Sequence, residues 1–199
     1  MSAKHPVISV TGSSGAGTTT VKHTFDQIFR REGIKAVFVE GDSFHRYDRA
    51  AMKTAIVEAG KKGNNHLSHF SPEANLLEDL QSLFKQYGES GTGRRRYYVH
   101  NTAEAEQHGT PPGTFTPWEE MPADTDVLLY EGLHGAYKGG DLDLPKHADL
   151  KIGVVPVINL EWTQKIHRDR EERGYSTEAV MDTILRRMPD YVRHICPQF

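Results

Sequence analysis

Four short runs of apolar and β-branched residues recur along the chain, and each is typical of a buried parallel strand. The runs cover residues 7–10, 35–40, 127–130 and 150–155. A strand that helices cover on both faces has no solvent side, so its apolar residues follow one another instead of alternating with polar ones. The runs therefore predict one mostly parallel sheet.

Between these runs, apolar residues return at intervals of three and four, which is the period of an amphipathic helix. The predicted helices cover residues 21–31, 49–59, 71–87 and 160–172, and another follows Ser176. Ser71 and Pro72 are expected to open the third helix, and Gly88 to end it. Strands that alternate with helices predict an α/β fold with helices on both faces of the sheet.

Residues 91–122 break this alternation. They contain Arg94, Arg95 and Arg96, then His100, and then a passage rich in glycine and proline. The segment predicts two short antiparallel strands around a long loop. The three arginines either bind a phosphate or keep a solvated edge strand from associating with other edges. His100 is ambiguous.

The composition narrows the functional class. The 199 residues predict one domain, and their net charge of −3 gives no global basic field for nucleic acid or an anionic membrane. No apolar run reaches the length of a membrane span. The single cysteine, Cys196, permits no internal disulfide, so we expect a reducing, cytoplasmic compartment.

The clearest chemical signal follows the first strand, where a glycine-rich stretch leads into a helix. Glycines let backbone N–H groups approach an anion, and the helix N-terminus adds positive dipole, so this order suits a phosphate. The pattern G-x-x-x-x-G-K-[ST] is met except that Thr18 stands in the lysine position, while Thr19 offers its hydroxyl to Mg²⁺. An ordinary glycine-rich βα turn is the alternative. The predicted nucleotide-binding residues are Gly12, Ser13, Ser14, Gly15, Ala16, Gly17, Thr18, Thr19 and Thr20.

Two carboxylates stand where predicted strands end. Asp42 follows the second strand, beside the phosphate loop, and is a candidate general base, or else a cap for the next turn. Glu131 ends the third strand, where P-loop proteins place an acidic residue that helps to hold Mg²⁺. A strand-end glutamate in solvent is the alternative for Glu131.

The last two predicted helices carry many charges. Lys165 and Asp169, and likewise Arg168 and Glu172, have the i,i+4 spacing of a salt-bridged surface helix. The same helices, hinged at Arg173 and Gly174, have the character of a phosphoryl-transfer lid whose closure brings guanidinium groups onto the moving phosphoryl group. Phosphate loop, acceptor-side Asp, metal carboxylate and cationic lid occur in the order that a nucleotide-dependent phosphotransferase needs.

Together these motifs resemble those of the bacterial phosphoribulokinase family, across essentially the whole chain. The phosphate loop of that family lacks the usual lysine, so the resemblance accounts for Thr18 at the lysine position. The implied fold is a P-loop mononucleotide-binding fold with a helical lid, and the implied reaction transfers the γ-phosphoryl group of ATP to O1 of D-ribulose 5-phosphate in the Calvin cycle. The segments that carry the resemblance are residues 12–20, 40–46, 130–135 and 165–170.

The resemblance also implies a role for each candidate residue. Asp42 is the base, Asp169 is a second essential carboxylate, and Glu131 with Thr19 handles Mg²⁺. Lys165 and Arg168 meet the transferring phosphoryl group. The residues expected to bind the sugar phosphate are His45, Arg49, Arg173 and His134.

Regulation and assembly are implied by the resemblance as well. Bacterial members of the family are oligomeric, are activated by NADH and are inhibited by AMP. The resemblance implies that Arg187 takes part in this allosteric coupling. Family members continue past Phe199, so we expect C-terminal strands of the family to be missing from the single domain of residues 1–199.

Two other functions fit the same core. One is a nucleoside or pantothenate kinase, and the other is a nucleotide-binding regulatory protein without turnover. A phosphorylated acceptor needs cations such as His45, Arg49 and Arg173, whereas a nucleoside needs stacking aromatic side chains, so the acceptor side separates the two enzymes.

Overall fold

Four parallel strands form the central sheet of the computed structural model, which describes residues 4–171 and 174–199. Their order is β2-β5-β1-β8. The predicted single parallel sheet is therefore confirmed. The strands are β1 (Val7–Gly12), β2 (Ala36–Glu40), β5 (Val127–Gly132) and β8 (Leu150–Val154).

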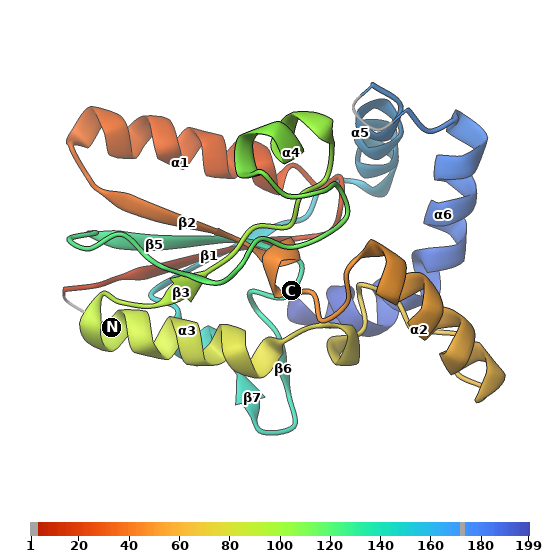
Figure 1. Ribbon diagram of the computed structural model, residues 1–199, viewed down its shortest axis with the longest axis horizontal. Helices are drawn as coiled ribbons and strands as arrows, with labels where there is room; N and C mark the ends of the chain where they lie inside the picture. Colours follow the sequence, from red (N-terminus) through yellow and green to blue (C-terminus); the bar gives the residue numbers. More distant parts are fainter. Residues whose placement is uncertain (1–3, 172–173) are drawn as a thin grey trace.

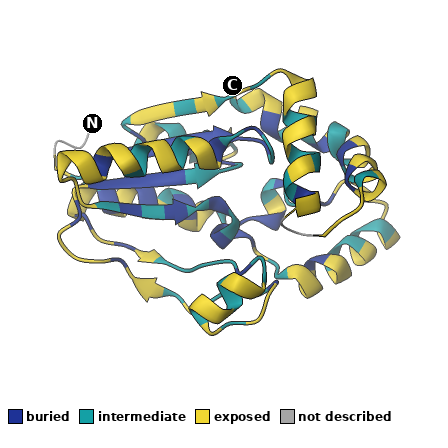
Figure 2. Ribbon diagram, turned by 90° about the horizontal axis from the view of Figure 1, so that it is seen from above, coloured by how far each residue is buried: buried dark blue, intermediate teal, exposed yellow. Residues whose placement is uncertain are grey.

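Helices cover both faces of this sheet, as the near-continuous apolar runs predict. Helix α1 (Thr18–Glu32) packs Phe29 against Ile8 and Leu129 on one face. Helix α3 (Leu77–Ser90) covers the opposite face (Figure 1), where Leu80, Phe84 and Tyr87 meet Val7, Leu128 and Tyr130. Successive strand residues point to opposite faces, and Figure 2 shows the buried residues concentrated in β1, β2 and β5. The edge strand β8 is largely exposed, so the prediction of a buried strand over residues 150–155 is wrong in this respect.

The start of α3 differs from the prediction. Pro72–Ala74 form only a short 3₁₀ turn, η2, and the helix begins at Leu77. Asn75 between them is extended because its neighbour Leu76 donates its backbone N–H to the carbonyl of Phe44, which fixes this segment beside another turn. The helix continues through Gly88 and ends at Gly91, whose φ of 69° is left-handed.

Residues 91–122 contain the predicted hairpin and an additional helix. Strand β3 (Arg94–Arg95) pairs antiparallel with β4 (Glu119–Glu120), as predicted. Helix α4 (Thr102–His108), which the sequence analysis missed, lies between them and is capped by Asn101, whose side chain accepts the N–H of Glu104. We call residues 91–122 the excursion.

The C-terminal helices stand beside the carboxyl ends of the strands (Figure 1). Helix α5 (Ile158–Glu171) and α6 (Thr177–Asp190) are joined through Gly174, whose φ is 69°. Ser176 caps α6, as predicted, by accepting the N–H of Ala179. In the part of the chain that the structure describes, no helix has the length and apolar character needed to cross a bilayer.

Shorter elements complete the described chain. Several of them connect the strands at the end of the sheet where α5 and α6 stand. These elements are η1 (Gly41–Phe44), α2 (Arg49–Lys61), β6 (Lys138–Gly139), β7 (Leu142–Asp143), η3 (Leu144–His147), the π-helical turn η4 (Tyr191–Ile195) and η5 (Cys196–Gln198).

The packing of α3 on the sheet makes a stability prediction. Phe84 is fully buried, and its ring meets that of Tyr130 edge to face at 5.4 Å. Phe84→Ala should lower the free energy of unfolding by about 3–5 kcal/mol, because it removes apolar contacts and leaves a cavity. Urea unfolding measures the change. Tyr175→Ala, at an exposed position, is the control and should change stability by about 0.5 kcal/mol or less; equal effects of the two variants would contradict this packing.

Candidate active site

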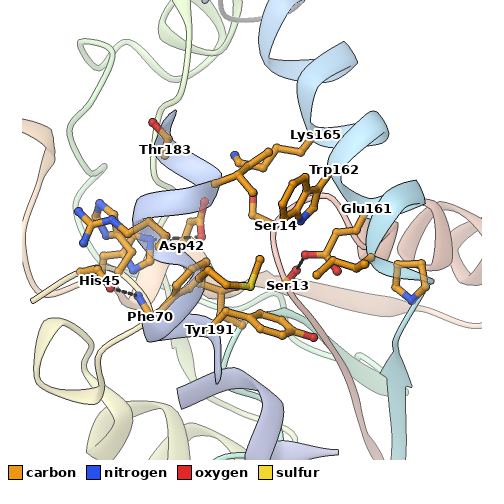
Figure 3. A pocket seen from close by; sticks show the side chains of 18 residues that line it. Ser13, Ser14, Asp42, His45, Phe70, Glu161, Trp162, Lys165, Thr183 and Tyr191 are labelled. Carbon is orange, nitrogen blue, oxygen red and sulfur yellow. Dashed lines mark hydrogen bonds and ion pairs between the residues drawn. The ribbon is translucent and has the colours of Figure 1, made fainter. Parts of the chain in front are cut away.

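A pocket of about 280 Å³ opens where the strands end and α5 and α6 approach them. Ser13 and Ser14 of the phosphate loop lie on one side of it, and Asp42 and His45 on another (Figure 3). Lys165 reaches it from α5, and Arg187 lines it from α6. The structure thus brings together residues from most of the predicted site segments.

The phosphate loop has the backbone that its glycines predict. Gly15 and Gly17 have φ values of 102° and 97°, a left-handed conformation that favours glycine. Helix α1 begins directly afterwards at Thr18, so its N-terminus lies at the loop. This arrangement provides the N–H groups and dipole that bind an anion.

Helix α5 rests directly on this loop. Ser13 donates a hydrogen bond from its hydroxyl to Glu161, and Arg168 donates from Nη2 to the hydroxyl oxygen of Ser14 at 3.0 Å. A side chain at Gly15 would meet Cβ of Lys165 at 2.8 Å, so only glycine allows this approach. The cations of α5 therefore lie beside the place that the loop prepares for phosphates.

Asp42 lies between two imidazoles. Its Oδ1 is 3.2 Å from Nε2 of His45, and its Oδ2 is 3.0 Å from Nε2 of His100. Partial burial favours the protonated carboxyl, but the two histidines outweigh it and hold the pKa of Asp42 well below its usual range. Because 40% of the Asp42 side chain is exposed, the carboxylate remains accessible.

A buried asparagine determines how His45 meets Asp42. Nδ2 of Asn75 donates to the carbonyls of His69 and Ser71, so its Oδ1 is left to accept from Nδ1–H of His45 at 2.8 Å. The other ring nitrogen of His45, Nε2, is thereby turned toward the carboxylate of Asp42.

His100 is held in the same way from the excursion. Its Nδ1 lies 3.1 Å from Oε2 of Glu104, while Nε2 meets Asp42. Burial lowers the pKa of His100, but the two carboxylates outweigh it and raise the pKa above the ordinary value. No local pattern in the sequence links His100 to Asp42, which lies 58 residues earlier in the chain.

Asp169 has a different environment from Asp42. It is buried on α5, with Nζ of Lys165 at 2.7 Å from Oδ2 and Nη2 of Arg168 at 2.8 Å from Oδ1. Burial raises its pKa, but these cations outweigh that effect and lower it. Both oxygens of Asp169 therefore have cationic partners, and in turn they orient Lys165 and Arg168.

Glu131 at the end of β5 meets Thr18 rather than Thr19, the residue expected to hold Mg²⁺ with it. Thr18 is buried and donates from its hydroxyl to Oε1 of Glu131 at 2.5 Å, whereas Thr19 is exposed. Consecutive helical residues point about 100° apart, so the first residue of α1 faces the strand ends and the second does not. Burial raises the pKa of Glu131.

His134 supports a neighbouring loop. It is buried, and its ring nitrogen Nε2 lies 3.0 Å from the carbonyl of Phe70. Burial lowers the pKa of His134 to about 4, so the ring is neutral and donates this hydrogen bond. His134 supports the loop that contains Phe70 and is not among the residues that line the pocket; its contact with substrate stays a prediction.

Three further predicted residues have distinct positions. Arg49 donates from Nη2 to the carbonyl of His100 at 2.9 Å, which places it on the His100 side of Asp42. Arg187 lines the pocket, donates to the carbonyl of Leu67 and pairs with Asp190. Arg173 lies outside the described residues.

The chain is similar to known proteins along its whole length. The model of the phosphoribulokinase/uridine kinase family matches residues 7–199. The phosphoribulokinase of Nitrobacter vulgaris is 65% identical over 199 residues, which are all of this chain and 69% of that protein. The phosphoribulokinase of Xanthobacter flavus is 66% identical over the same 199 residues, 68% of its length.

A solved structure agrees with these relatives. The phosphoribulokinase from Rhodobacter spheroides superposes with a TM-score of 0.82 at 59% identity. The match covers 98% of this chain and 67% of that one. The chain thus spans about two thirds of the length of the proteins that it matches.

The buried histidine predicts a pH dependence of stability. The folded-state pKa of His134 is about 4, below the ordinary 6.5, so between these values the unfolded chain binds a proton that the folded chain does not. The free energy of unfolding should therefore fall as pH drops from 6.5 to 4, by about 3 kcal/mol from this residue. In His134→Gln, which keeps a donor for Phe70 but cannot titrate, chemical unfolding at several pH values should show a correspondingly smaller fall. Parallel pH curves for the two proteins would contradict the assignment.

Proposed function

The chain belongs to the phosphoribulokinase/uridine kinase family, and we propose how its site transfers the γ-phosphoryl group of ATP to O1 of D-ribulose 5-phosphate. The predicted α/β kinase fold and ATP-dependent phosphotransferase are confirmed by relatives that bear the name phosphoribulokinase at 65% and 59% identity. The product is ribulose 1,5-bisphosphate of the Calvin cycle. The observation that carries the mechanism is the accessible carboxylate of Asp42 between two imidazoles, beside the phosphate loop.

We assign proton abstraction to Asp42. As O1 of the sugar bonds to the γ-phosphorus, the bond from that phosphorus to the β–γ bridging oxygen breaks, and ADP leaves with the electron pair. The proton of the O1 hydroxyl passes to Asp42, as it does to the catalytic-loop Asp in protein kinases. The histidines keep Asp42 ionised and aimed, and 40% exposure of its side chain allows contact with the hydroxyl.

We assign electrostatic stabilisation to α5. Lys165 and Arg168 lie beside Ser13 and Ser14, where their charges oppose the negative charge that develops on the transferring phosphoryl group. Asp169 holds both cations and has no free oxygen to serve as the base. Its role in this proposal is to orient them.

The strand-end carboxylate of Glu131 fits a magnesium ion bound with the nucleotide. Among residues 4–171 and 174–199 there is no cluster of three or more His, Cys, Asp or Glu side chains that could hold a metal alone. Mg²⁺ in kinases, however, needs only one or two carboxylates, because water and substrate phosphates complete its shell. Glu131 and the hydroxyls of Thr18 and Thr19 are the protein groups that would hold it, and the ion would neutralise charge on the β- and γ-phosphates.

The acceptor side of the site is cationic. His45 and Arg49 flank Asp42, the first by direct contact and the second through His100, which suits a phosphorylated sugar. We retain Arg173 as a further ligand on the family resemblance alone. The names of the relatives also favour a sugar phosphate over a nucleoside.

Regulation and location complete the proposal. We propose that NADH activates and AMP inhibits an oligomeric form of the enzyme in the cytoplasm, as the family resemblance implies. Arg187 is a suitable coupling residue, since it joins the lid helix α6 to the loop at Leu67 while lining the pocket.

The first prediction concerns the base. Asp42→Asn keeps the shape of the side chain but cannot take the proton, so kcat should fall by about 10²–10⁴, with little change in the Kd for ATP. Steady-state kinetics and calorimetry give the two values. Asp48→Asn, at the cap of α2, is the control and should retain activity. Near-normal turnover in Asp42→Asn with a large loss in Asp169→Asn would reverse the assignment.

The second prediction concerns magnesium. Glu131→Gln should raise the Mg²⁺ concentration needed for half-maximal activity by about tenfold or more, because a ligand charge is lost. Calorimetry without metal should show almost unchanged nucleotide binding. Glu120→Gln, on the exposed strand β4, should match the wild type. If Glu131→Gln keeps the magnesium dependence of the wild type, Glu131 is an ordinary structural residue and does not bind the ion.

The third prediction concerns the sugar phosphate. Arg49→Ala should raise its KM about tenfold to hundredfold, the effect of losing a charge-assisted hydrogen bond of roughly 1.5–3 kcal/mol, and leave the KM for ATP nearly unchanged. Arg30→Ala, whose exposed side chain pairs with Asp26, should change neither constant. A rise confined to the KM for ATP would show that Arg49 contacts ATP and not the sugar phosphate.

A further inference from the structure

Arg96 has a different environment from the two arginines that precede it. Arg94 and Arg95 pair across the hairpin with Glu120 and Glu119, as a solvated edge strand does. Arg96 instead donates from Nε to the carbonyl of Ser43 at 2.7 Å and from Nη2 to the carbonyl of His45 at 2.8 Å. The triplet therefore contains two residues that pair within the hairpin and one residue that joins the excursion to η1.

Aromatic rings hold this guanidinium in place. Its central carbon lies 3.7 Å from the ring centre of Phe115 and 4.7 Å from that of Trp118. Trp118 in turn meets the ring of Phe44 edge to face at 5.5 Å. A planar cation stacked on ring faces loses most of its rotational freedom, so its N–H groups point in fixed directions.

The two carbonyls belong to the turn that presents the catalytic carboxylate. Ser43 and His45 flank Phe44, and Asp42 directly precedes them in η1. The other side of the turn is held by the backbone bond from Leu76 to the carbonyl of Phe44. Arg96 ties the turn from the excursion, the same segment that delivers His100 to Asp42.

We propose that Arg96 is a positioning residue for phosphoryl transfer, which fixes the turn so that Asp42 and His45 meet the acceptor in the reactive orientation. The proposal rests on the proposed function of Asp42. Arg96 touches neither substrate in this account and acts through the backbone of residues 43 and 45. Small displacements of a reacting group are enough to slow catalysis, since a shift of about 1 Å costs up to about a hundredfold.

Lysine cannot replace this arrangement. Its ammonium is a compact charge on a flexible stem, whereas the guanidinium spans two acceptors in one plane and stacks on rings. Arg96→Lys should therefore behave like Arg96→Ala, although it conserves charge. A role based on charge alone would be rescued by lysine.

The experiment compares Arg96→Lys and Arg96→Ala with Arg94→Ala, a matched control from the same triplet. In both Arg96 variants kcat should fall by about tenfold to hundredfold and the KM for ribulose 5-phosphate should rise, while the Kd for ATP stays within about twofold of the wild type. Guanidinium chloride at low millimolar concentration should restore part of the kcat of Arg96→Ala, and none in Asp42→Asn. Arg94→Ala should match the wild type throughout.

Circular dichroism and the Kd for ATP identify the folded variants. Wild-type kcat in a folded Arg96→Ala, or full rescue by lysine, would overturn the proposal, as would equal losses in Arg94→Ala. Turnover that survives in Asp42→Asn would overturn the base assignment instead. In that case the affinity for ribulose 5-phosphate, measured by calorimetry without ATP, still tests the proposal. Because Arg96 also fixes His45, which faces the sugar phosphate in our proposal, this affinity should be lower in the Arg96 variants than in the wild type.

Discussion

The carboxylate of Asp42 between two imidazoles is the interaction on which the rest of the site depends. His45 meets one oxygen and His100 the other. Asp42 can take this position because residue 41 before it is glycine, where the ends of β2 and β5 approach closely. A side chain at Gly41 would meet the hydroxyl of Tyr130 at 2.6 Å and Cα of Gly132 at 2.9 Å. Each imidazole has its own support, Asn75 for His45 and Glu104 for His100. The carboxylate is therefore held ionised and oriented before a substrate arrives.

In our proposal, two aspartates of the same chemistry have separate tasks because their surroundings differ. Asp42 is partly exposed at a strand end, and its partners are groups that can exchange protons. Asp169 is buried on α5 between Lys165 and Arg168, the cations that we assign to the transferring phosphoryl group. A general base must be accessible to the hydroxyl whose proton it takes, and Asp42 meets this condition. A residue that orients cations must be bonded to them, and Asp169 meets that one. The phosphate loop packs against Glu161 and Arg168 of α5.

Local patterns were enough to predict the sheet and the segments of the site. Apolar runs and glycines depend only on neighbours in sequence, so β1, β2, β5 and β8 and the phosphate loop were found. Details that depend on packing were not. Whether Thr18 or Thr19 faces Glu131 depends on the rotation of α1, and the burial of His134 depends on how it packs against the loop at Phe70.

Contacts between distant segments were the least predictable part. Arg96 is indistinguishable from Arg94 and Arg95 in the sequence, yet it alone of the three bonds to the turn at Ser43 and His45. Asn75 likewise sat in a segment predicted to be helical, whereas its side chain bridges three groups outside any helix. Such contacts follow from the path of the whole chain, which no local pattern encodes.

The most direct test of the account is the titration of Asp42 itself. Carbon-13 NMR of protein labelled at the aspartate carboxyls, with Asp42 assigned by its loss in Asp42→Asn, measures the pKa of this one group. The account predicts a value well below the ordinary range of an aspartate and a rise toward that range when His100 is replaced by Gln. A pKa at or above the ordinary value, or one that His100→Gln leaves unchanged, would contradict it.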